Sequence, residues 1–208
     1  MKKGQFYSLK IVFVLPVFLC SCATVGIEKA KYTVLEKKGS LELRQYAPQI
    51  IAETIVDTDF DQAGNMAFNR LYNYISGRNI TQESIRMTAP VNQAASTGKI
   101  AMTAPVNHQQ TQGKYAVSFL MPYKYTLETI PQPLDPSIVI KQVPARKIAA
   151  IRYSGTWSHN RYEQKKSILE SFIQEKGLTP TAQPIFARYD PPFQLWFLRR
   201  NEVLIPVD

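Results

Sequence analysis

Apolar side chains recur at helical spacing in two long stretches of the chain. The first stretch covers about residues 59–76 and the second about residues 158–176. Side chains three and four positions apart share one face of an α-helix, so each stretch predicts a helix with one buried face. Thr58 and Ser158 are the expected N-caps, because a hydroxyl there can accept a bond from a free backbone N–H. The predicted inner faces are Phe60, Ala63, Ala67, Leu71 and Ile75 in the first helix, and Tyr162, Leu169, Phe172 and Ile173 in the second.

The chain before each predicted helix follows one common pattern. Residues 43–52 and residues 140–149 both run from an apolar residue through a basic residue and glutamine to an Ala/Pro pair, and then return to Ile and Ala. A strand, a turn that contains proline and a second strand explain this order. The chain is therefore predicted to contain two related units, each with a strand pair followed by a helix and a further strand.

A shorter repeat follows the first predicted helix. The sequence Met-Thr-Ala-Pro-Val-Asn occurs at residues 87–92 and again at residues 102–107. Apolar residues alternate through both copies, which predicts two strands, and the polar residues 93–99 are the expected hairpin loop between them. The remaining predicted strands cover residues 115–121, 186–189, 195–198 and 203–207.

These elements predict an α+β fold. Duplicated strand-strand-helix-strand halves are expected to form a distorted antiparallel sheet or barrel flanked by two main helices. Each half alone buries only one face of its sheet, so two halves that close on each other bury a shared core. A chain of 208 residues with 45% hydrophobic residues is large enough for such a core.

The N-terminus has the features of an export signal. Residues 1–10 are basic, and residues 11–19 form an apolar run that is too short for a membrane span, which needs about 20 residues. The run leads into Leu19-Cys20-Ser21-Cys22, where the spacing is similar to a lipobox with Ser21 before the modified cysteine. We expect cleavage before Cys22 and acylation of its thiol. A plain signal, or a cysteine buried in a membrane anchor, is the alternative.

This interpretation divides the chain into a lipoprotein signal peptide (residues 1–21), a tether (22–30) and a ligand-binding domain (31–208). Acyl chains on Cys22 would hold the protein on a lipid bilayer. By similarity to lipoproteins in general, Ala23 after the cysteine is typical of outer-membrane sorting. We therefore expect a cell-envelope protein on the periplasmic face of the outer membrane.

The composition narrows the classes of partner and of chemistry. The formal net charge is +9, which suits an anionic partner, but the basic residues are scattered. No run of five Lys or Arg and no nucleic-acid-binding module occurs, so no nucleic-acid partner is expected. The chain has no nucleophile elbow, no zinc-protease signature, no Cys-x-x-Cys and no phosphate-binding glycine loop. We therefore expect neither a catalytic nor a metal site, and a binding protein rather than an enzyme.

Four short motifs occur in one order along residues 31–208. They are Glu-Leu-Arg-Gln-Tyr-Ala-Pro (42–48), Met-Thr-Ala-Pro-Val (87–91, with its second copy), Tyr-Asp-Pro-Pro-Phe (189–193) and Arg-Asn-Glu-Val (200–203). With these motifs the chain resembles the SOUL haem-binding protein family, and the doubled element resembles its bacterial branch. The resemblance implies a distorted sheet or barrel with two helices. It also implies non-covalent binding of haem or another tetrapyrrole in a hydrophobic groove.

The chain differs from some animal members of this family at a proposed iron ligand. Those members carry a histidine between the Arg and Tyr of the first motif, where this chain has Gln45. Glutamine does not ligate haem iron as imidazole does, so ligation by that route is not expected. The two histidines, His108 and His159, are expected in a polar loop and in the first turn of the second helix.

We therefore expect binding without an iron bond. An apolar groove buries the porphyrin ring, and a basic residue at its rim pairs with a propionate. A stripe of every fourth residue on the outer side of the first helix is the predicted groove wall, although an ordinary helix surface explains it too. Two methionines of the repeated motif carry thioethers that can ligate iron, but such residues more often fill cores. The candidate groove residues are Met66, Arg70, Tyr74, Arg86, Met87 and Met102.

Two other functions fit the same residues. The domain can be a binding module for another amphipathic or anionic small molecule. It can also be a structural envelope lipoprotein without a ligand.

Overall fold

The computed structural model describes residues 27–96 and 113–208. Nine strands form one sheet in the order β2-β3-β9-β11-β10-β6-β7-β4-β8, in which every neighbouring pair is antiparallel. A second, two-stranded parallel sheet pairs β1 with β5. The strands are β1 (Glu28–Lys29), β2 (Tyr32–Lys38), β3 (Leu41–Tyr46), β4 (Gln49–Asp57), β5 (Thr88–Ala89), β6 (Val91–Ala95), β7 (Lys114–Leu120), β8 (Ile138–Val143), β9 (Arg146–Tyr153), β10 (Ile185–Arg188) and β11 (Asn201–Val207). The helices are α1 (Phe60–Ile75), α2 (His159–Glu175) and a single 3-10 turn, η1 (Trp196–Leu198).

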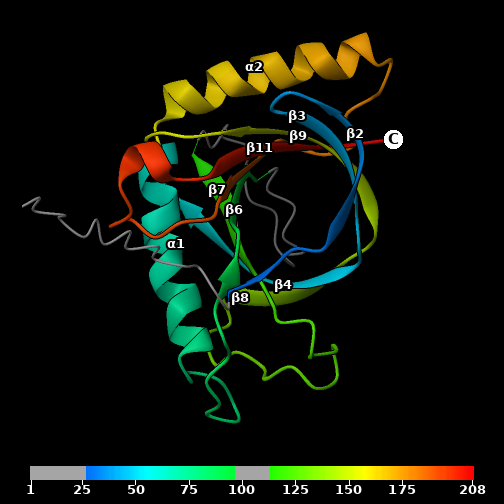
Figure 1. Ribbon diagram of the computed structural model, residues 1–208. Helices are drawn as coiled ribbons and strands as arrows, with labels where there is room; N and C mark the ends of the chain where they lie inside the picture. The colour runs from blue at the N-terminus through cyan, green and yellow to red at the C-terminus, as the bar shows by residue number, and fades with distance from the viewer. Residues whose placement is uncertain (1–26, 97–112) are drawn as a thin grey trace, which may run out of the picture.

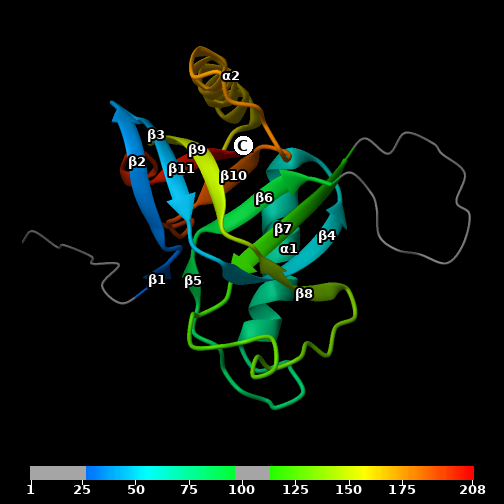
Figure 2. The same ribbon diagram turned by 90° about the vertical axis from the view of Figure 1, so that its right-hand side faces the viewer.

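The large sheet curls into a half-barrel, and both helices lie on its outer side (Figure 1). Figure 2 shows α1 behind β4, β6 and β7 when the molecule is turned by 90°. The two faces of β4 follow the alternation of its side chains. Ala52 and Val56 are buried in the core that includes α1, whereas Ile51, Glu53 and Ile55 line a cavity in the concave face.

The two predicted helices are confirmed, together with their buried faces. All nine predicted inner-face side chains are buried, those of α1 mainly against β4 and β7 and those of α2 against β9 and β11. The predicted cap of the first helix is wrong by one residue. Asp59, not Thr58, has the extended backbone of an N-cap, and its Oδ1 accepts a hydrogen bond from the Gln62 backbone N–H at 2.8 Å. Ser158 is the N-cap of α2, but its side chain makes no capping bond.

The duplicated halves exchange their first strands. β3 and β4 were expected to pair with each other, as were β8 and β9, but β3 pairs with β9 and β4 with β8. Corresponding strands lie symmetrically about the contact between β6 and β10, so that β3 matches β8 and β4 matches β9. Each half therefore completes the sheet of the other, and the two halves form one interlocked domain.

The predictions for the shorter segments had mixed outcomes. The strands expected at residues 115–121, 186–189 and 203–207 are present as β7, β10 and β11. The strand expected at residues 195–198 is wrong, because the chain makes η1 there and its apolar side chains point into solvent. The first copy of the short repeat forms β5 and β6, and β6 extends into the expected loop. The second copy, at residues 100–107, lies outside the described residues.

Candidate ligand-binding site

An apolar pocket of about 660 Å³ lies beside α1. Three segments form its walls: the middle of α1, residues 87–91, and the chain that leaves β10. Its volume falls within the range of about 300–1,000 Å³ that is common for small-molecule sites. The lining residues are Ile27, Gly64, Asn65, Phe68, Asn69, Met87, Thr88, Ala89, Val91, Trp157, Arg188, Tyr189, Asp190, Pro191, Pro192 and Phe193.

Arg188, the last residue of β10, is a buried cation in this wall. Its side chain is nearly inaccessible, and the guanidinium carbon lies 5.1 Å from the centre of the Trp157 ring. Nη2 donates a hydrogen bond to Gln93 Oε1 at 3.2 Å. Burial lowers the pKa of Arg188 to about 10. Within residues 27–96 and 113–208, no carboxylate forms an ion pair with it. Since a buried charge without a partner is unfavourable, the wall favours a ligand that brings an anion.

Gly64 of α1 gives Arg188 the space that it occupies. A Cβ atom built on Gly64 would lie 1.5 Å from Nη2 of Arg188, far inside van der Waals contact. Glycine in the middle of a helix costs about 1 kcal/mol relative to alanine. Close approach of the guanidinium explains why the helix carries glycine at this position.

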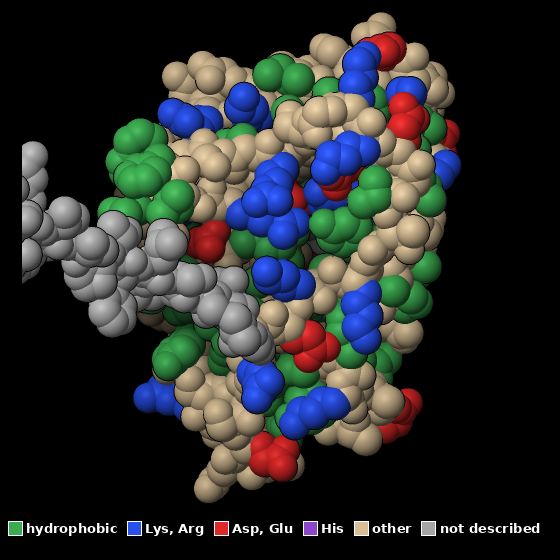
Figure 3. All heavy atoms as spheres, viewed as in Figure 1, with side chains coloured by type: hydrophobic (Ala, Val, Ile, Leu, Met, Phe, Trp, Pro, Cys, Tyr) green, Lys and Arg blue, Asp and Glu red, His purple; other side chains and the backbone are tan. Residues whose placement is uncertain are grey.

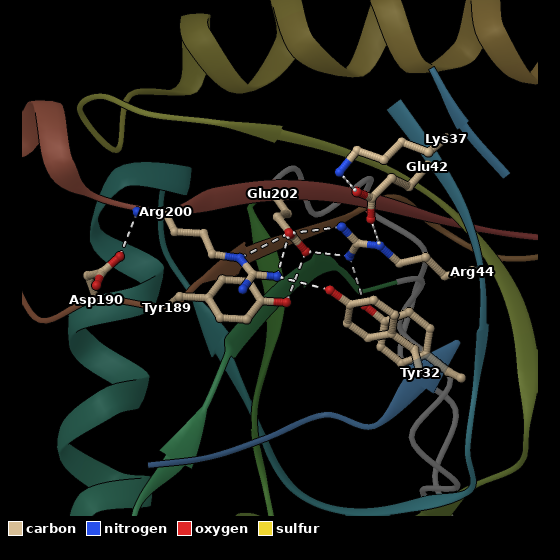
Figure 4. Close-up of polar contacts among 9 residues, drawn as sticks. Tyr32, Lys37, Glu42, Arg44, Tyr189, Asp190, Arg200 and Glu202 are labelled. Atoms are coloured by element: carbon tan, nitrogen blue, oxygen red, sulfur yellow. Dashed lines mark hydrogen bonds and ion pairs between the residues drawn. The ribbon is translucent and has the colours of Figure 1, made fainter. Parts of the chain in front are cut away.

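A buried ionic cluster lies beside the pocket and has Glu202 of β11 at its centre (Figure 4). The carboxylate accepts two bonds from the Arg44 guanidinium, at 2.7 and 3.0 Å. It accepts two more from Arg200, at 3.1 and 2.8 Å, and one from the Tyr189 hydroxyl at 2.9 Å. Burial alone would raise the pKa of Glu202, but the bonds and charges of Arg44 and Arg200 outweigh burial and hold this pKa below its ordinary value.

Further side chains complete the cluster at its edge. Arg44 Nε donates to Glu42 Oε2 at 2.8 Å, and Arg44 Nη1 donates to the Tyr46 hydroxyl at 3.2 Å. Arg200 Nη2 donates to the Tyr32 hydroxyl at 3.2 Å. Burial raises the pKa of Tyr46 to about 12, so it stays a neutral phenol. Every central charge has a partner and Glu202 has no solvent-exposed surface, so the cluster has the features of a structural element.

The cluster fixes both ends of the loop whose first residues, 189–193, line the pocket. Tyr189 begins this loop and Arg200 ends it, and the Arg200 backbone N–H donates to Asp190 Oδ2 at 2.5 Å. Within the loop, Arg199 donates to the backbone oxygens of Gln194 at 2.9 Å and Pro192 at 2.5 Å. The carboxylate of Asp190 faces this backbone, so it does not neutralise Arg188. These hydrogen bonds therefore hold the loop in one conformation as a wall of the pocket.

Of the predicted groove residues that the structure describes, only Met87 lines this pocket. Met66 and Arg86 are exposed and lie outside the pocket lining, and Arg70 Nη1 donates to the Ile55 backbone oxygen at 3.3 Å. Tyr74 is buried, and its hydroxyl donates to the Pro131 backbone oxygen at 2.7 Å. Placing Tyr74 on the outer side of the helix was wrong, because residues four apart drift by about 40° per step in a helix of 3.6 residues per turn. Met102, Cys22 and His108 lie outside the described residues.

Iron-ligating side chains are scarce in the pocket. Met87 and Tyr189 line it, and the Tyr189 hydroxyl is already bound to Glu202. His159 begins α2 as predicted, but its ring lies 4.7 Å from that of Phe60 and outside the pocket lining. Gln45 is exposed on β3 and also lies outside the lining. In the part of the chain that the structure describes, no three His, Cys, Asp or Glu residues are grouped as a metal site.

The sequence pattern did not reveal the most informative pocket residues, Gly64, Arg188 and Trp157. Arg188 stands directly before the Tyr-Asp-Pro-Pro-Phe motif, and this position was a usable signal. Gly64 interrupts the apolar face of a predicted helix, which often indicates a close contact. Neither signal predicts that Gly64 and Arg188 are in contact.

A second cavity, of about 930 Å³, lies in the concave face of the half-barrel. Glu53, Lys141, Gln142 and Arg146 are among its lining residues, so its surface is far more polar than that of the apolar pocket. Burial lowers the pKa of Arg146, and its Nε has no hydrogen-bond partner among the described residues. This cavity is less suited to a flat apolar ring.

None of the helices in the described parts of the chain combines the length and the apolar character that crossing a membrane requires.

The interlocked halves form one α+β domain, and its apolar pocket has the size that is common for small-molecule sites. The family model described as "SOUL heme-binding protein" matches residues 27–206, and the chain belongs to this family. Heme-binding protein 2 of Mus musculus is 25% identical over 183 residues, which cover 84% of this chain and 85% of the mouse protein. Heme-binding protein 2 of Homo sapiens is 25% identical over 173 residues, which cover 79% of this chain and 80% of the human protein.

Solved structures share the fold at low sequence identity. The C-terminal domain of EcmrR has a TM-score of 0.60 and 12% identity, and the match covers 85% of this chain and 98% of that domain. A hydrolase from Listeria innocua has a TM-score of 0.53 and 9% identity, with 84% and 94% covered. These likenesses support the architecture alone.

Proposed function

We propose that this protein binds haem or a related porphyrin non-covalently in the apolar pocket beside α1. Family membership supports haem binding in general. The observation that carries the proposal is the combination of a largely apolar lining with Arg188, a buried cation that lacks an ion-pair partner among the described residues. A porphyrin has a broad apolar ring and anionic propionates, and this combination matches both.

Each wall has a distinct part in the proposed binding. Phe68, Met87 and Phe193 bury the ring, which is favourable by about 25 cal/mol per Å² of apolar surface removed from water. The Arg188 guanidinium pairs with one propionate, and low water access strengthens this pair. Trp157, which also lines the pocket, contacts the guanidinium through its ring and helps to hold Arg188 in place. Binding of this kind needs no bond to iron.

We further propose that the protein acts on a membrane of the cell envelope. Residues 1–21 are removed as a signal peptide, and acylated Cys22 holds the domain on the periplasmic face of the outer membrane. The lipobox-like sequence around Cys22 supports this step. Mass spectrometry of the membrane-bound protein tests it, because acylation adds diacylglyceryl mass to Cys22. Substitution of Cys22 by serine should abolish that mass and release the protein from membranes.

A titration with matched porphyrins tests the pocket. Wild-type protein, Arg188→Gln and Arg86→Gln are titrated with haem and followed by the Soret band. Loss of the buried charged pair should weaken binding by roughly 10- to 100-fold in Arg188→Gln. Arg86→Gln is the control, since Arg86 is exposed and outside the pocket lining. Haem dimethyl ester should bind the wild type and Arg188→Gln equally weakly, because its esters carry no charge for Arg188.

Two outcomes would overturn the proposal. One is the absence of saturable binding to the wild type, and the other is an equal effect of both arginine substitutions. Iron-free protoporphyrin addresses ligation. Undiminished affinity for it agrees with binding without an iron bond, whereas loss of affinity in His108→Ala, His159→Ala or Met87→Leu would show a ligating side chain.

A binding module for another amphipathic anion is the second candidate. Arg188 recognises an anionic group whatever apolar body carries it, and this observation favours the wider class. Competition between haem and a fatty acid decides between the two. A fatty acid that displaces haem and binds more tightly, with the same dependence on Arg188, would assign the pocket to that ligand. A wild-type protein that binds neither would leave a structural envelope lipoprotein as the remaining function.

A further inference from the structure

Large apolar side chains are exposed together in the loop between β10 and β11. Phe193 is 86% exposed, and four further apolar side chains, those of residues 195–198, are each between 52% and 58% exposed. Such a concentration of exposed apolar surface usually indicates an interaction site. Figure 3 shows apolar side chains gathered at one edge of the molecule, with Lys and Arg side chains on the same face. We call these residues the apolar loop cluster: Phe193, Leu195, Trp196, Phe197 and Leu198.

Backbone and side-chain bonds hold the apolar loop cluster in place. The Leu198 backbone N–H donates to the Leu195 oxygen at 2.9 Å, which closes the single turn of η1. Arg199 bonds to two backbone oxygens of the same loop. The Trp196 and Phe197 rings meet edge to face, with centroids 5.5 Å apart. The apolar surface is therefore held in a defined shape. Little further conformational entropy of the loop is lost when it binds a partner.

Cationic side chains lie next to this cluster. One small depression is lined by Leu198 and also by Lys29, Arg152 and Arg200. Lys29 and Arg152 are exposed, and no ion pair involves either of them among the described residues. An apolar group that enters the acyl region and cations that meet phosphate are the two features of proteins that lie on an anionic bilayer. Tryptophan in particular is favoured at this interface.

The start of the described chain lies at the same place. Ile27 lines the apolar pocket together with Phe193, and it lines the small depression together with Leu198. Cys22 precedes Ile27 by five residues, and five extended residues span at most about 17 Å. An acylated Cys22 would thus keep the apolar loop cluster within reach of the bilayer.

We propose that the apolar loop cluster docks on an anionic lipid surface. Trp196 and Phe197 enter the acyl boundary, and Lys29 and Arg152 meet lipid phosphates. This goes beyond the proposed haem binding, because neither Trp196 nor Phe197 lines the apolar pocket. Docking also turns Phe193, which belongs to both the cluster and the pocket, toward the membrane. An apolar ligand dissolved in the bilayer then meets the pocket directly.

Fluorescence quenching by brominated acyl chains tests the docking in the full chain. The chain has two tryptophans, so Trp196→Phe identifies the share of the signal from Trp196. All variants keep residues 1–26, so attachment through the leader is the same in each of them. Differences in quenching between the variants therefore report the entry of this loop. The vesicles are phosphatidylcholine with and without phosphatidylglycerol. The test variant is Phe197→Ser/Leu198→Ser, and the control is Ile80→Ser/Leu134→Ser, at two other highly exposed apolar residues.

Docking predicts strong quenching of Trp196 in the wild type when phosphatidylglycerol is present. The test variant should lower the quenching at least about threefold, because part of the inserting apolar surface is gone. The control should equal the wild type, and high salt or omission of phosphatidylglycerol should weaken quenching. Arg188→Gln should dock normally, while the test variant should bind haem normally, so the two proposals fail separately.

Three results would overturn the docking proposal. The first is a Trp196 emission that brominated lipid leaves unchanged. The second is equal quenching with and without phosphatidylglycerol. The third is a blue shift of Trp196 emission that depends on protein concentration and not on lipid, which would show that a second copy of the chain covers the cluster.

Discussion

The buried ionic cluster makes Glu202→Gln a test of how the fold is held together. The substitution keeps the size and shape of the side chain but replaces one carboxylate oxygen by an NH₂ group. In the wild type, Oε1 accepts three hydrogen bonds and Oε2 accepts two, all from Arg44, Arg200 and Tyr189. An NH₂ group at either position would face donors, and the Arg44 guanidinium would lose its buried counter-ion.

The expected loss follows from this geometry. Arg44 is 1% exposed and Glu202 is 0% exposed, so water cannot replace the missing bonds. Removal of one partner from a buried ion pair costs about 3–5 kcal/mol. Single domains have total stabilities of about 5–15 kcal/mol. For a domain of this size the loss lowers the Tm by roughly 6–20 °C.

The stability that Glu202 contributes should also depend on pH. The folded-state pKa of Glu202 is lowered, so the ionised carboxylate stabilises the fold above its ordinary pKa of 4.5. This stabilisation is lost as the pH falls through the lowered folded-state pKa. The difference in unfolding free energy between the wild type and Glu202→Gln should therefore be full near neutral pH and shrink below about pH 4.5.

Urea unfolding followed by circular dichroism measures both effects. Glu53→Gln is the control, because Glu53 pairs with a largely exposed lysine, Lys141, at the rim of the concave cavity. Such a pair contributes only about 0–1 kcal/mol. A loss below about 1 kcal/mol in Glu202→Gln, or a loss equal to that of the control, would refute the role of the cluster as a structural element of the fold.

Four smaller changes probe the pocket and its surroundings. Gly64→Ala should keep α1 helical in circular dichroism but weaken haem binding about tenfold or more, because its Cβ displaces Arg188. Arg188→Met should raise the Tm of the ligand-free protein in a thermal melt, since it removes a buried unpaired cation. Asp59→Ala should cost about 1 kcal/mol in urea unfolding through loss of the bond from Gln62. Arg199→Gln should speed amide exchange at residues 193–198 and leave exchange in α2 unchanged.

Local pattern predicted the elements of this fold well. All of the inner-face residues expected from the periodicity of α1 and α2 are buried. This succeeded because residues on one face of a helix recur at intervals of three and four. The end of α1 has a local cause too, since Gly77 follows it with φ of 108°, in the left-handed region that favours glycine.

Strand pairing could not be predicted in the same way. The pattern at residues 43–52 specifies two strands and a turn, but it does not specify which strand lies beside each. Consecutive strands are neighbours in roughly two-thirds of cases, and that preference favoured the wrong pairing here. The exchange depends on contacts between the halves, such as β3 with β9, which are distant in sequence.

The candidate site was harder still. Arg188 and its hydrogen-bond partner Gln93 are 95 residues apart, and Gly64 has no side chain by which to predict its contact. The stripe of Met66, Arg70 and Tyr74 looked continuous on a helix surface, but it turns from solvent into the core along its length. Met87 was found because the repeated motif drew attention to it.

The family motifs divide between two physical tasks, and this division bears on where ligand specificity lies. Residues 42–48 and 200–203 supply the ionic cluster, whereas residues 87–91 and 189–193 supply walls of the pocket. Tyr189 belongs to both, because its ring lines the pocket and its hydroxyl binds Glu202. The cluster can therefore fix the shape of the pocket without touching a ligand. Arg188 and Gly64 lie outside the motifs, so the charge proposed to select an anionic ligand can change while the fold and all four motifs are kept.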